Sequence, residues 1–567
     1  MLESQLTQSQ HAVSVSSPSE TLTFPERHVY QDDQCIVSPQ YASDPHEQSV
    51  HAAADEVDYL SLTAMSGPDA SGHSFKSDPC STAFTRQIIE LSGANPGASL
   101  PRDQLRGNIH GTSTSNGMRS VFDLSRLDCT SFLRICCRLS AADWPLLSLS
   151  TCLEALKTVS RVDHSSSAIV APQASPQETI LAFVPVTIGI LLSRQHHNLR
   201  TTVTALVERI EDANIALSKS GSDLSVVQGL MFQALLSLYH ANASSTWHLT
   251  GLATTKAISM GLHHTPNATD DKALSEARES LFWCIYILDR SMAFSMDRPF
   301  GLEDYDMTLQ LPTHSENPDT CSTAASSKKL HIWTVHYVHM LSQWRLDGST
   351  DLDVCFTSYQ HWHATYKELA EHMLCENSSS TDGEGLTAYL RKQESQLVCK
   401  ALVQLVGSFM GRSCSAQLFQ DVRYAVSYNV PQLISRLKTY TVDREMSLTF
   451  LDAYDLFAAI LAYLYFLRFA EHPSSISQPV WTPMRPGISD MRLLMTSIDI
   501  LQTVAERFPV IGDLKEVLWA FLAALDNDRH VRNGSTDDPM QKLDDEITNC
   551  ALPIPSHWKT LIYSCLR

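Results

Sequence analysis

Cysteine and histidine side chains are the first candidates for chemistry in this sequence, because they bind metal ions and act as nucleophiles. Cys355, His361 and His363 lie close together in the chain. However, His361 and His363 are two residues apart on a predicted helix, so they face different directions. Three more pairs are adjacent in sequence, which is poor spacing for chelating one ion: Cys136–Cys137, His196–His197 and His263–His264. We therefore expect buried cysteines and surface histidines here, and we assign no metal site and no cofactor.

Catalytic motifs are also absent from the sequence. It contains no G-x-S-x-G nucleophile elbow, no dinucleotide-binding G-x-G-x-x-G, no phosphate-binding loop and no H-E-x-x-H. The nearest glycine-rich stretch, residues 111–117, lacks the final spacing of a phosphate-binding loop. The sequence therefore predicts no catalytic residue and favours a protein that is not an enzyme.

Asp289 and Arg290 are two charged residues near the end of a predicted helix that is apolar on almost every side. Charges in such a setting mark either a functional site or a buried ion pair, and burial is tolerated when the charges are paired. Arg278 precedes Asp289 by about three turns on the same helix face, and Arg298 follows the helix. We interpret the charges as a structural ion pair that links Asp289 to Arg278 or Arg298. We also expect Trp283 to lie in the core.

The elements around these charges follow from the residue pattern. Asp270 and Asp271 precede the helix, where short acidic side chains cap free N–H groups. Arg298-Pro299-Phe300-Gly301 must turn the chain after the helix, since proline fixes φ and glycine permits conformations that other residues avoid. An acidic segment, residues 303–306, is expected to be extended and leads to Leu311-Pro312.

Residues 276–312 resemble the middle region of the fungal-specific transcription factor domain. Members of that family carry an R-x-x-x-F-W-x-x-Y-x-x-D-R helix, a G/D-R-P turn and an acidic run that ends in L-P. The eight residues that match the helix and the turn, here called the signature residues, are Arg278, Phe282, Trp283, Tyr286, Asp289, Arg290, Arg298 and Pro299. The predicted helices 226–241 and 247–263 are also similar to the family, and the resemblance covers residues 120–312 better than the C-terminal half.

The DNA-binding module that the resemblance implies is a zinc cluster held by six cysteines in two C-x2-C-x6-C halves. Residues 1–110 contain two cysteines, Cys35 and Cys80, and no C-x2-C pair occurs in the sequence. A finger with two cysteines and two histidines is missing too. The formal net charge of −20 argues against a broad nucleic-acid-binding face.

Composition and periodicity predict an all-α fold preceded by an acidic tail. Residues 1–110 carry five basic and fourteen acidic side chains without a sustained apolar period, which predicts disorder. Residues 55–62 mix acids with bulky apolar groups, as an activation segment does, although a solvated tail explains them equally well. Residues 111–312 are assigned to the middle homology region, and residues 313–567 to a helical extension packed on the same body.

The apolar spacing predicts a series of helices after residue 120. Pro185 is expected to break the first long helical run near its start, and Gly261 to end a later helix. The longest apolar run, residues 456–467, is shorter than the roughly 20 residues that span a bilayer, so we predict a core helix of a soluble protein. A helix is predicted from residue 276 to a point before the turn at residue 298. The other predicted ranges after residue 178 are 179–218, 226–241, 247–261, 328–346, 351–373, 386–410, 430–440, 446–471, 489–508 and 513–525.

The resemblance implies a nuclear transcriptional regulator, often of metabolic or secondary-metabolite genes. It would contact other transcription factors, coactivators or a second copy of itself. It would reach DNA through a DNA-binding partner or through a zinc cluster that is missing from this sequence. Scattered cysteines and a polar N-terminus favour a reducing compartment. The alternative is a helical scaffold or small-molecule-binding protein without a transcriptional role.

Overall fold

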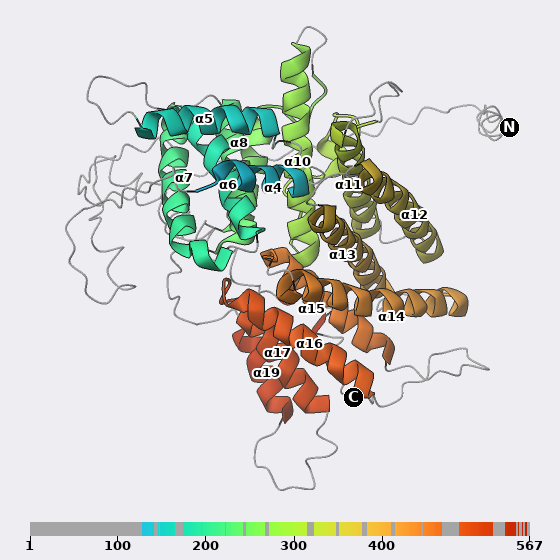
Figure 1. The fold of residues 1–567 in the computed structure, drawn as a ribbon. Coiled ribbons are helices and arrows are strands. Elements are labelled where there is room, and N and C mark those ends of the chain that lie inside the picture. Colours follow the sequence, from blue (N-terminus) through green and yellow to red (C-terminus); the bar gives the residue numbers. More distant parts are fainter. Residues whose placement is uncertain are drawn as a thin grey trace, which may run out of the picture. The chain divides into compact units, whose positions relative to one another are not determined.

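The computed structural model describes residues 127–563, apart from short gaps. The longest gaps are residues 165–173, 314–322, 468–486 and 526–538. The predicted acidic tail, its segment 55–62 and the cysteines Cys35 and Cys80 therefore lie outside the described residues. Within the described part, every regular element is a helix, which confirms the all-α prediction (Figure 1).

The first group of helices precedes the predicted turn at residues 298–301 and contains the helix that carries the signature residues. Its members are α4 (Cys129–Ser140), α5 (Leu149–His164), α6 (Pro176–Leu191), α7 (Arg200–Ser220), α8 (Asp223–Tyr239), α9 (Thr246–Ser259) and α10 (Lys272–Met296).

The second group of helices follows the turn. Its members are α11 (Thr323–Leu346), α12 (Leu352–Glu376), α13 (Gly383–Phe409), α14 (Ala416–Lys438), α15 (Phe450–Leu467), α16 (Ile488–Ala505), α17 (Ile511–Leu525) and α19 (Pro539–Asn549).

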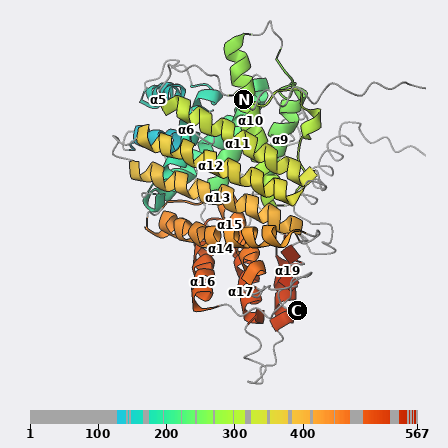
Figure 2. The same cartoon turned by 90° about the vertical axis from the view of Figure 1, so that its right-hand side faces the viewer.

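Helices that follow one another in the chain mostly pack side by side. The series α11, α12 and α13 shows this most clearly in Figure 2. The two groups contact each other at several places: α10 packs on α11 and α15, α8 contacts α15, and α4 contacts α13. The C-terminal half of α10 therefore lies among helices from both groups, and this position buries the five signature residues from Phe282 to Arg290. Arg278 and Arg298 are half-buried, and Pro299 is exposed.

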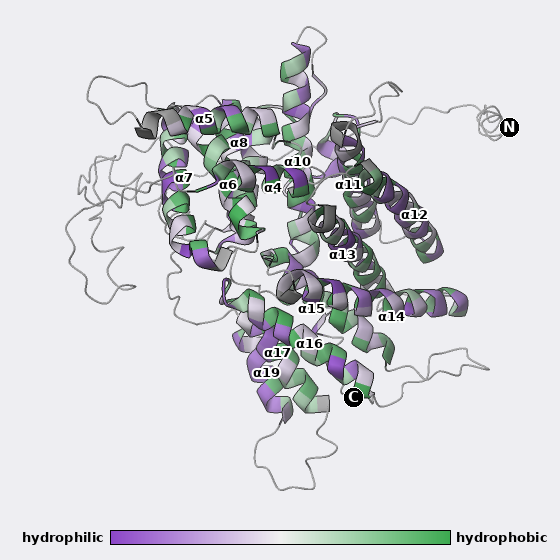
Figure 3. Cartoon of the chain, in the orientation of Figure 1, coloured by the Kyte–Doolittle hydropathy of each residue, from purple (hydrophilic) through white to green (hydrophobic). Residues whose placement is uncertain are grey.

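Helix α15 is the most apolar of the long helices. Among the described residues it is the one helix long and apolar enough to cross a membrane, and 78% of it is buried inside the protein. This burial confirms the prediction of a core helix for residues 456–467. Other helices are amphipathic: Figure 3 shows hydrophilic and hydrophobic residues alternating along α14.

Two helix ends were predicted correctly. Gly261 has a φ of +66°, as the residue after a helix often does, and Leu262 is buried behind it. The Leu262 N–H donates to the Ala257 carbonyl at 3.0 Å and the Gly261 N–H to the Ile258 carbonyl at 2.9 Å, which together satisfy the last turn of α9. At the start of α10, Asp271 Oδ1 accepts the Ala273 N–H at 3.3 Å, while Asp270 lies outside the described residues.

Two predictions of helix bounds were wrong, and each of the two helices contains a proline. Pro185 lies inside α6 and does not break it; the predicted run 179–218 instead divides between α6 and α7, after residue 191. Pro431 lies inside α14, which begins at Ala416 rather than at residue 430. Most of α6 around Pro185 is buried, so tertiary packing outweighs the one backbone hydrogen bond that proline removes.

Candidate functional site

The signature helix α10 is buried through most of its second half. Trp283 is 3% exposed, which confirms its predicted place in the core. Its ring packs edge-on against the rings of Phe282 and Tyr286, with centroids 5.2 and 5.4 Å away. These aromatic contacts fix the face of α10 from which the Tyr286 hydroxyl extends towards the polar residues of the site.

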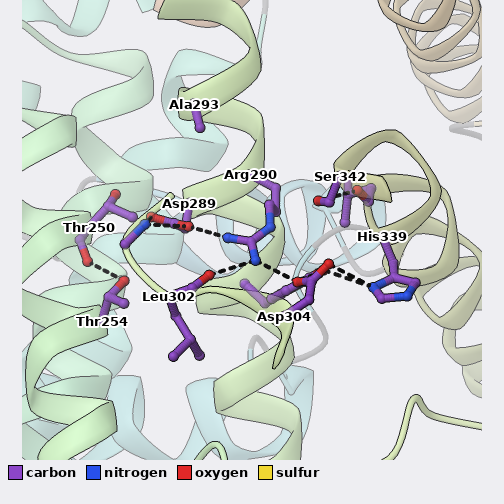
Figure 4. A network of polar contacts seen from close by, with 12 residues as sticks. Thr250, Thr254, Asp289, Arg290, Ala293, Leu302, Asp304, His339 and Ser342 are labelled. Atoms are coloured by element: carbon purple, nitrogen blue, oxygen red, sulfur yellow. Dashed lines mark hydrogen bonds and ion pairs between the residues drawn. The ribbon is translucent and has the colours of Figure 1, made fainter. Parts of the chain in front are cut away.

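Arg290 is the centre of a buried polar network, here called the Arg290 cluster and drawn in Figure 4. Its side chain is fully buried, and Nη1 lies 2.7 Å from Asp289 Oδ2. Nη2 lies 2.6 Å from Asp304 Oδ1 and donates to the Leu302 carbonyl at 2.7 Å. One guanidinium on α10 therefore holds both its neighbour on the helix and the chain segment that follows the turn.

Aromatic rings cover the remaining faces of this guanidinium. Its carbon lies 4.4 Å from the centre of the Tyr286 ring and 3.9 Å from that of Phe300. Arg345 of α11 approaches the Phe300 ring as well, at 5.1 Å, and donates to the Ala293 carbonyl of α10. Cation–π contacts of this kind strengthen when water is excluded, so the rings contribute to holding the buried charge.

Asp304 connects the cluster to α11. Its Oδ1 accepts the Tyr286 hydroxyl at 2.8 Å, and its Oδ2 lies 3.3 Å from His339 Nδ1 and 3.1 Å from Gln343 Nε2. A carboxylate that receives donors from α10 and α11 fixes the relative position of the two helices.

The turn at Gly301 approaches α10 closely. The Gly301 N–H donates to both carboxylate oxygens of Asp289, at 3.1 Å each. A Cβ at this position would lie 2.8 Å from Asp289 Oδ1 and 3.1 Å from Thr254 Cγ2. Glycine is needed here because the backbone comes too near to the carboxylate for a larger residue, and not because of an unusual φ.

The predicted ion pair has a different partner from the two expected. Asp289 pairs with its neighbour Arg290, whereas Arg278 Nη2 donates to the Met260 carbonyl at 3.1 Å. The Arg298 guanidinium lies over Trp247, 5.7 Å from the ring centre. The helical period placed Arg278 on the right face, but three turns exceed the reach of the side chains. Asp289 instead pairs with the adjacent residue, because the long side chain of Arg290 folds back onto it.

The acidic segment was also predicted incorrectly. Residues 304–306 form a short 3-10 helix rather than an extended run. The reason is local: the Asp306 N–H donates to the Glu303 carbonyl at 3.1 Å, and this turn directs Asp304 inward. Tyr305, between the two aspartates, is 81% exposed.

The two carboxylates of the cluster differ in acidity. Burial acts to raise the pKa of Asp304, but hydrogen bonds from His339 and Arg290 outweigh it and bring the pKa to about 2. Burial raises the pKa of Asp289, and this effect exceeds the opposite effects of Arg290 and of the Gly301 N–H. Burial also acts to lower the pKa of Arg290, but Asp289 and Asp304 raise it. One guanidinium faces two carboxylates. A proton taken up by the cluster therefore goes to Asp289, which accepts hydrogen bonds from fewer groups than Asp304 does.

The candidate metal ligands are placed apart. Cys355 is buried, His361 is exposed, and His363 Nε2 pairs with Glu394 Oε1 at 3.1 Å. His263 and His264 have ring centres 3.8 Å apart. Cys136 and Cys137 are buried in α4, and the side chains of His196 and His197 lie outside the description. Within the described residues, no three histidine, cysteine or acidic side chains gather as a metal site would require.

Two further buried ion pairs were missed by the sequence analysis. Lys392 Nζ lies 3.1 Å from Asp452 Oδ2, and Lys400 Nζ lies 3.2 Å from Asp455 Oδ2, so both pairs join α13 to α15. Ser295 at the end of α10 donates to Asp455 at 2.7 Å. The signal was available: two aspartates three residues apart in the otherwise apolar start of α15 require partners.

Comparison with known proteins places the Arg290 cluster inside a described domain. Residues 162–352 match the fungal specific transcription factor domain, a range that runs from α5 to the start of α12. It therefore contains Asp289, Arg290, Asp304 and the turn between them. No solved structure matches the chain.

The similar proteins are fungal regulators. The chain is 29% identical over 114 residues to pyrimidine pathway regulatory protein 1 of Saccharomyces cerevisiae, covering 20% of this chain and 13% of that protein. It is 26% identical over 134 residues to a negative regulator of pleiotropic drug resistance of Candida glabrata, covering 22% and 13%. It is 24% identical over 124 residues to a positive regulator of purine utilization of Emericella nidulans, covering 17% and 12%. The alignments span a small share of each relative.

Proposed function

We propose that the protein, whose residues 162–352 match the fungal specific transcription factor domain, is a nuclear regulator of a metabolic or secondary-metabolite gene set. The domain match carries the proposal. The names of two similar proteins, which refer to a pyrimidine pathway and to purine utilization, support a metabolic target. Because other relatives include a negative regulator, the names support both activation and repression.

In this proposal the signature residues have a structural role. Arg290 and its carboxylates are buried and bonded to one another, so they offer no open group to a substrate. They attach the turn after α10 to the helix and to α11. The outer surfaces of the helices then serve to contact coactivators, other transcription factors or a second copy of the chain.

The chain is proposed to reach promoters through a DNA-binding partner, or through a zinc cluster outside this sequence. Specific binding needs lysines and arginines that neutralise phosphates and an element that enters a groove. Residues 1–110 carry five basic and fourteen acidic side chains, and no basic run in the sequence is longer than two residues, as in Lys328-Lys329. Acidic surfaces of this kind repel a duplex.

Two measurements test the proposal together: gel shift of the purified chain on promoter fragments at moderate salt, and promoter occupancy in cells. We expect no sequence-selective shift from the 567-residue chain alone, and occupancy that disappears when a DNA-binding partner is deleted. Selective binding by the isolated chain would contradict the indirect route. Absence from every promoter, with unchanged transcript levels after gene deletion, would favour the scaffold or small-molecule-binding alternative.

A further inference from the structure

A cavity of about 250 Å³ lies where the two groups of helices meet, away from the Arg290 cluster. One side is formed by the end of α6, the start of α7 and the residues that follow α8. The other side is formed by the segment before α15 and the end of α16. The lining includes Arg200, Val203, His240, Ser447, Leu448 and Arg507.

Two polar atoms in the lining have no hydrogen-bond partner in the described structure. Ser447 is 4% exposed, and its hydroxyl is buried without a partner. His240 Nδ1 is buried without one as well. Buried polar atoms are almost always satisfied in proteins, so these two are candidate hydrogen-bonding groups for a ligand in the cavity that their residues line.

The charge in the lining is predominantly positive. Arg507 donates to two backbone carbonyls, Tyr239 O at 3.1 Å and Leu448 O at 2.5 Å, which use two of its five N–H groups. Arg200 lies exposed at the start of α7, and its charge acts on Arg507. Of the nearby acids, Glu506 is exposed and Asp452 is paired with Lys392.

The acidities of the lining groups agree with an anion site. Burial lowers the pKa of Arg507 to about 10, although nearby acids oppose this effect. Burial, together with the charge of Arg507, lowers the pKa of His240 to about 4. At neutral pH the arginine is therefore charged and incompletely compensated, while the histidine is a neutral hydrogen-bonding group.

We propose that this cavity binds a small organic carboxylate. The carboxylate accepts hydrogen bonds from Arg507 and the Ser447 hydroxyl, and an apolar body packs on Val203, Leu448 and Val504. Arg200 at the entrance attracts the anion. The volume of about 250 Å³ lies just below the roughly 300–1,000 Å³ of typical ligand pockets, so a compact metabolite is the expected ligand.

The cavity joins the matched domain to the C-terminal helices. Arg200 and His240 belong to residues 162–352, whereas Ser447 and Arg507 come from beyond them. Bound ligand would therefore stabilise the packing between the two parts. This inference does not depend on the transcriptional role, because binding is measured on the purified chain.

The test is calorimetric titration of the full chain with three carboxylates, isovalerate, benzoate and succinate, with thermal unfolding as a second readout. At least one should bind saturably. Benzyl alcohol, a neutral analogue of benzoate, should bind at least about 10-fold more weakly, because a hydrogen bond to a charged group is lost. Inorganic phosphate tests an oxyanion that lacks an apolar body, and should bind more weakly than the best carboxylate.

Variants locate the site. Ser447→Ala and Arg200→Gln should each weaken carboxylate binding about 3- to 10-fold without unfolding the chain, since the hydroxyl is unpaired and Arg200 is exposed. Arg492→Gln, which removes an exposed arginine near the start of α16, is the matched control and should leave binding unchanged. The proposal is wrong if no carboxylate binds, if benzyl alcohol or phosphate binds equally well, or if binding is unaffected by Ser447→Ala.

Discussion

Arg290 and Arg507 are two arginines that the fold withdraws from water to different extents, the first fully buried and the second half-buried. Arg290 pairs with two carboxylates, one on its own helix and one on the following turn. Arg507 donates hydrogen bonds to two backbone carbonyls and lines a cavity. Carboxylates raise the pKa of the first arginine, whereas burial lowers that of the second. Arg290 Nε has no hydrogen-bond partner among the described residues, so the two arginines differ in charge neutralisation rather than in the number of bonds made. The comparison teaches that a buried charge is structural when carboxylates neutralise it, and a candidate for ligand binding when a neighbouring cavity has room for a counter-charge.

The largest expected effect comes from removing the first arginine. Arg290→Met should lower the free energy of unfolding by about 3–5 kcal/mol, because Asp289 and Asp304 would stay buried without their cation. Arg507→Met should cost about 1–3 kcal/mol, since it removes hydrogen bonds to carbonyls and leaves no carboxylate buried. Urea denaturation of both variants measures the difference. Equal losses would remove the distinction between the two regions.

Truncating the aromatic packing beside Arg290 should have an effect of similar size. Trp283→Ala is expected to lower the free energy of unfolding by about 3–5 kcal/mol, as large buried aromatic residues do. Trp519 on α17 is 44% exposed, so Trp519→Ala is the matched control, with an expected loss of about 1 kcal/mol. If Trp283→Ala left stability unchanged but abolished transcriptional activity, α10 would be a contact surface rather than core.

Acid should weaken the Arg290 cluster through Asp304. Its pKa falls from 3.8 to about 2 on folding, so its stabilisation is complete above pH 4 and is lost as the pH falls through 2. The loss is about 2 kcal/mol. Asp289 has a raised pKa and acts in the opposite direction: its contribution is present at low pH and is lost as the pH rises.

Denaturation of the wild type and of Asp304→Asn from pH 7 to pH 2 isolates the Asp304 contribution. The stability difference between the two proteins should be largest near neutral pH and should shrink below pH 4. A difference that stays constant across this range would show that Asp304 is not ionised in the folded cluster.

The sequence predicted the kind of fold better than the contacts within it. Helical spacing identified α10 and its core residue Trp283, because burial follows directly from the apolar period. The pairing of Asp289 with Arg290 was not predicted. The helical period shows which residues share a helix face, but it does not show that a long side chain will fold back onto its neighbour. Asp304 points inward because of a local 3-10 turn, which a run of acidic residues does not predict. The cavity near Arg507 arises from segments far apart in the chain, for which a single sequence carries no signal.

The smallest expected effect tests how closely the turn approaches the Arg290 cluster. Gly301→Ala would place a Cβ 2.8 Å from Asp289 Oδ1, an atom that Arg290 and the turn itself hold in place. The carboxylate must therefore shift, and we expect a loss of about 1–2 kcal/mol in unfolding free energy. Gly251→Ala is the control, because no atom lies within 4 Å of its added Cβ and it lies within α9. There alanine should stabilise the protein by about 0.5–1 kcal/mol, since it favours the helix over glycine. Opposite signs for two glycine-to-alanine changes would show that the turn, unlike the helix surface, tolerates no added atom. If both changes stabilised the protein, the Asp289 carboxylate would be free to move, and the Arg290 cluster would be less rigid than its hydrogen bonds indicate.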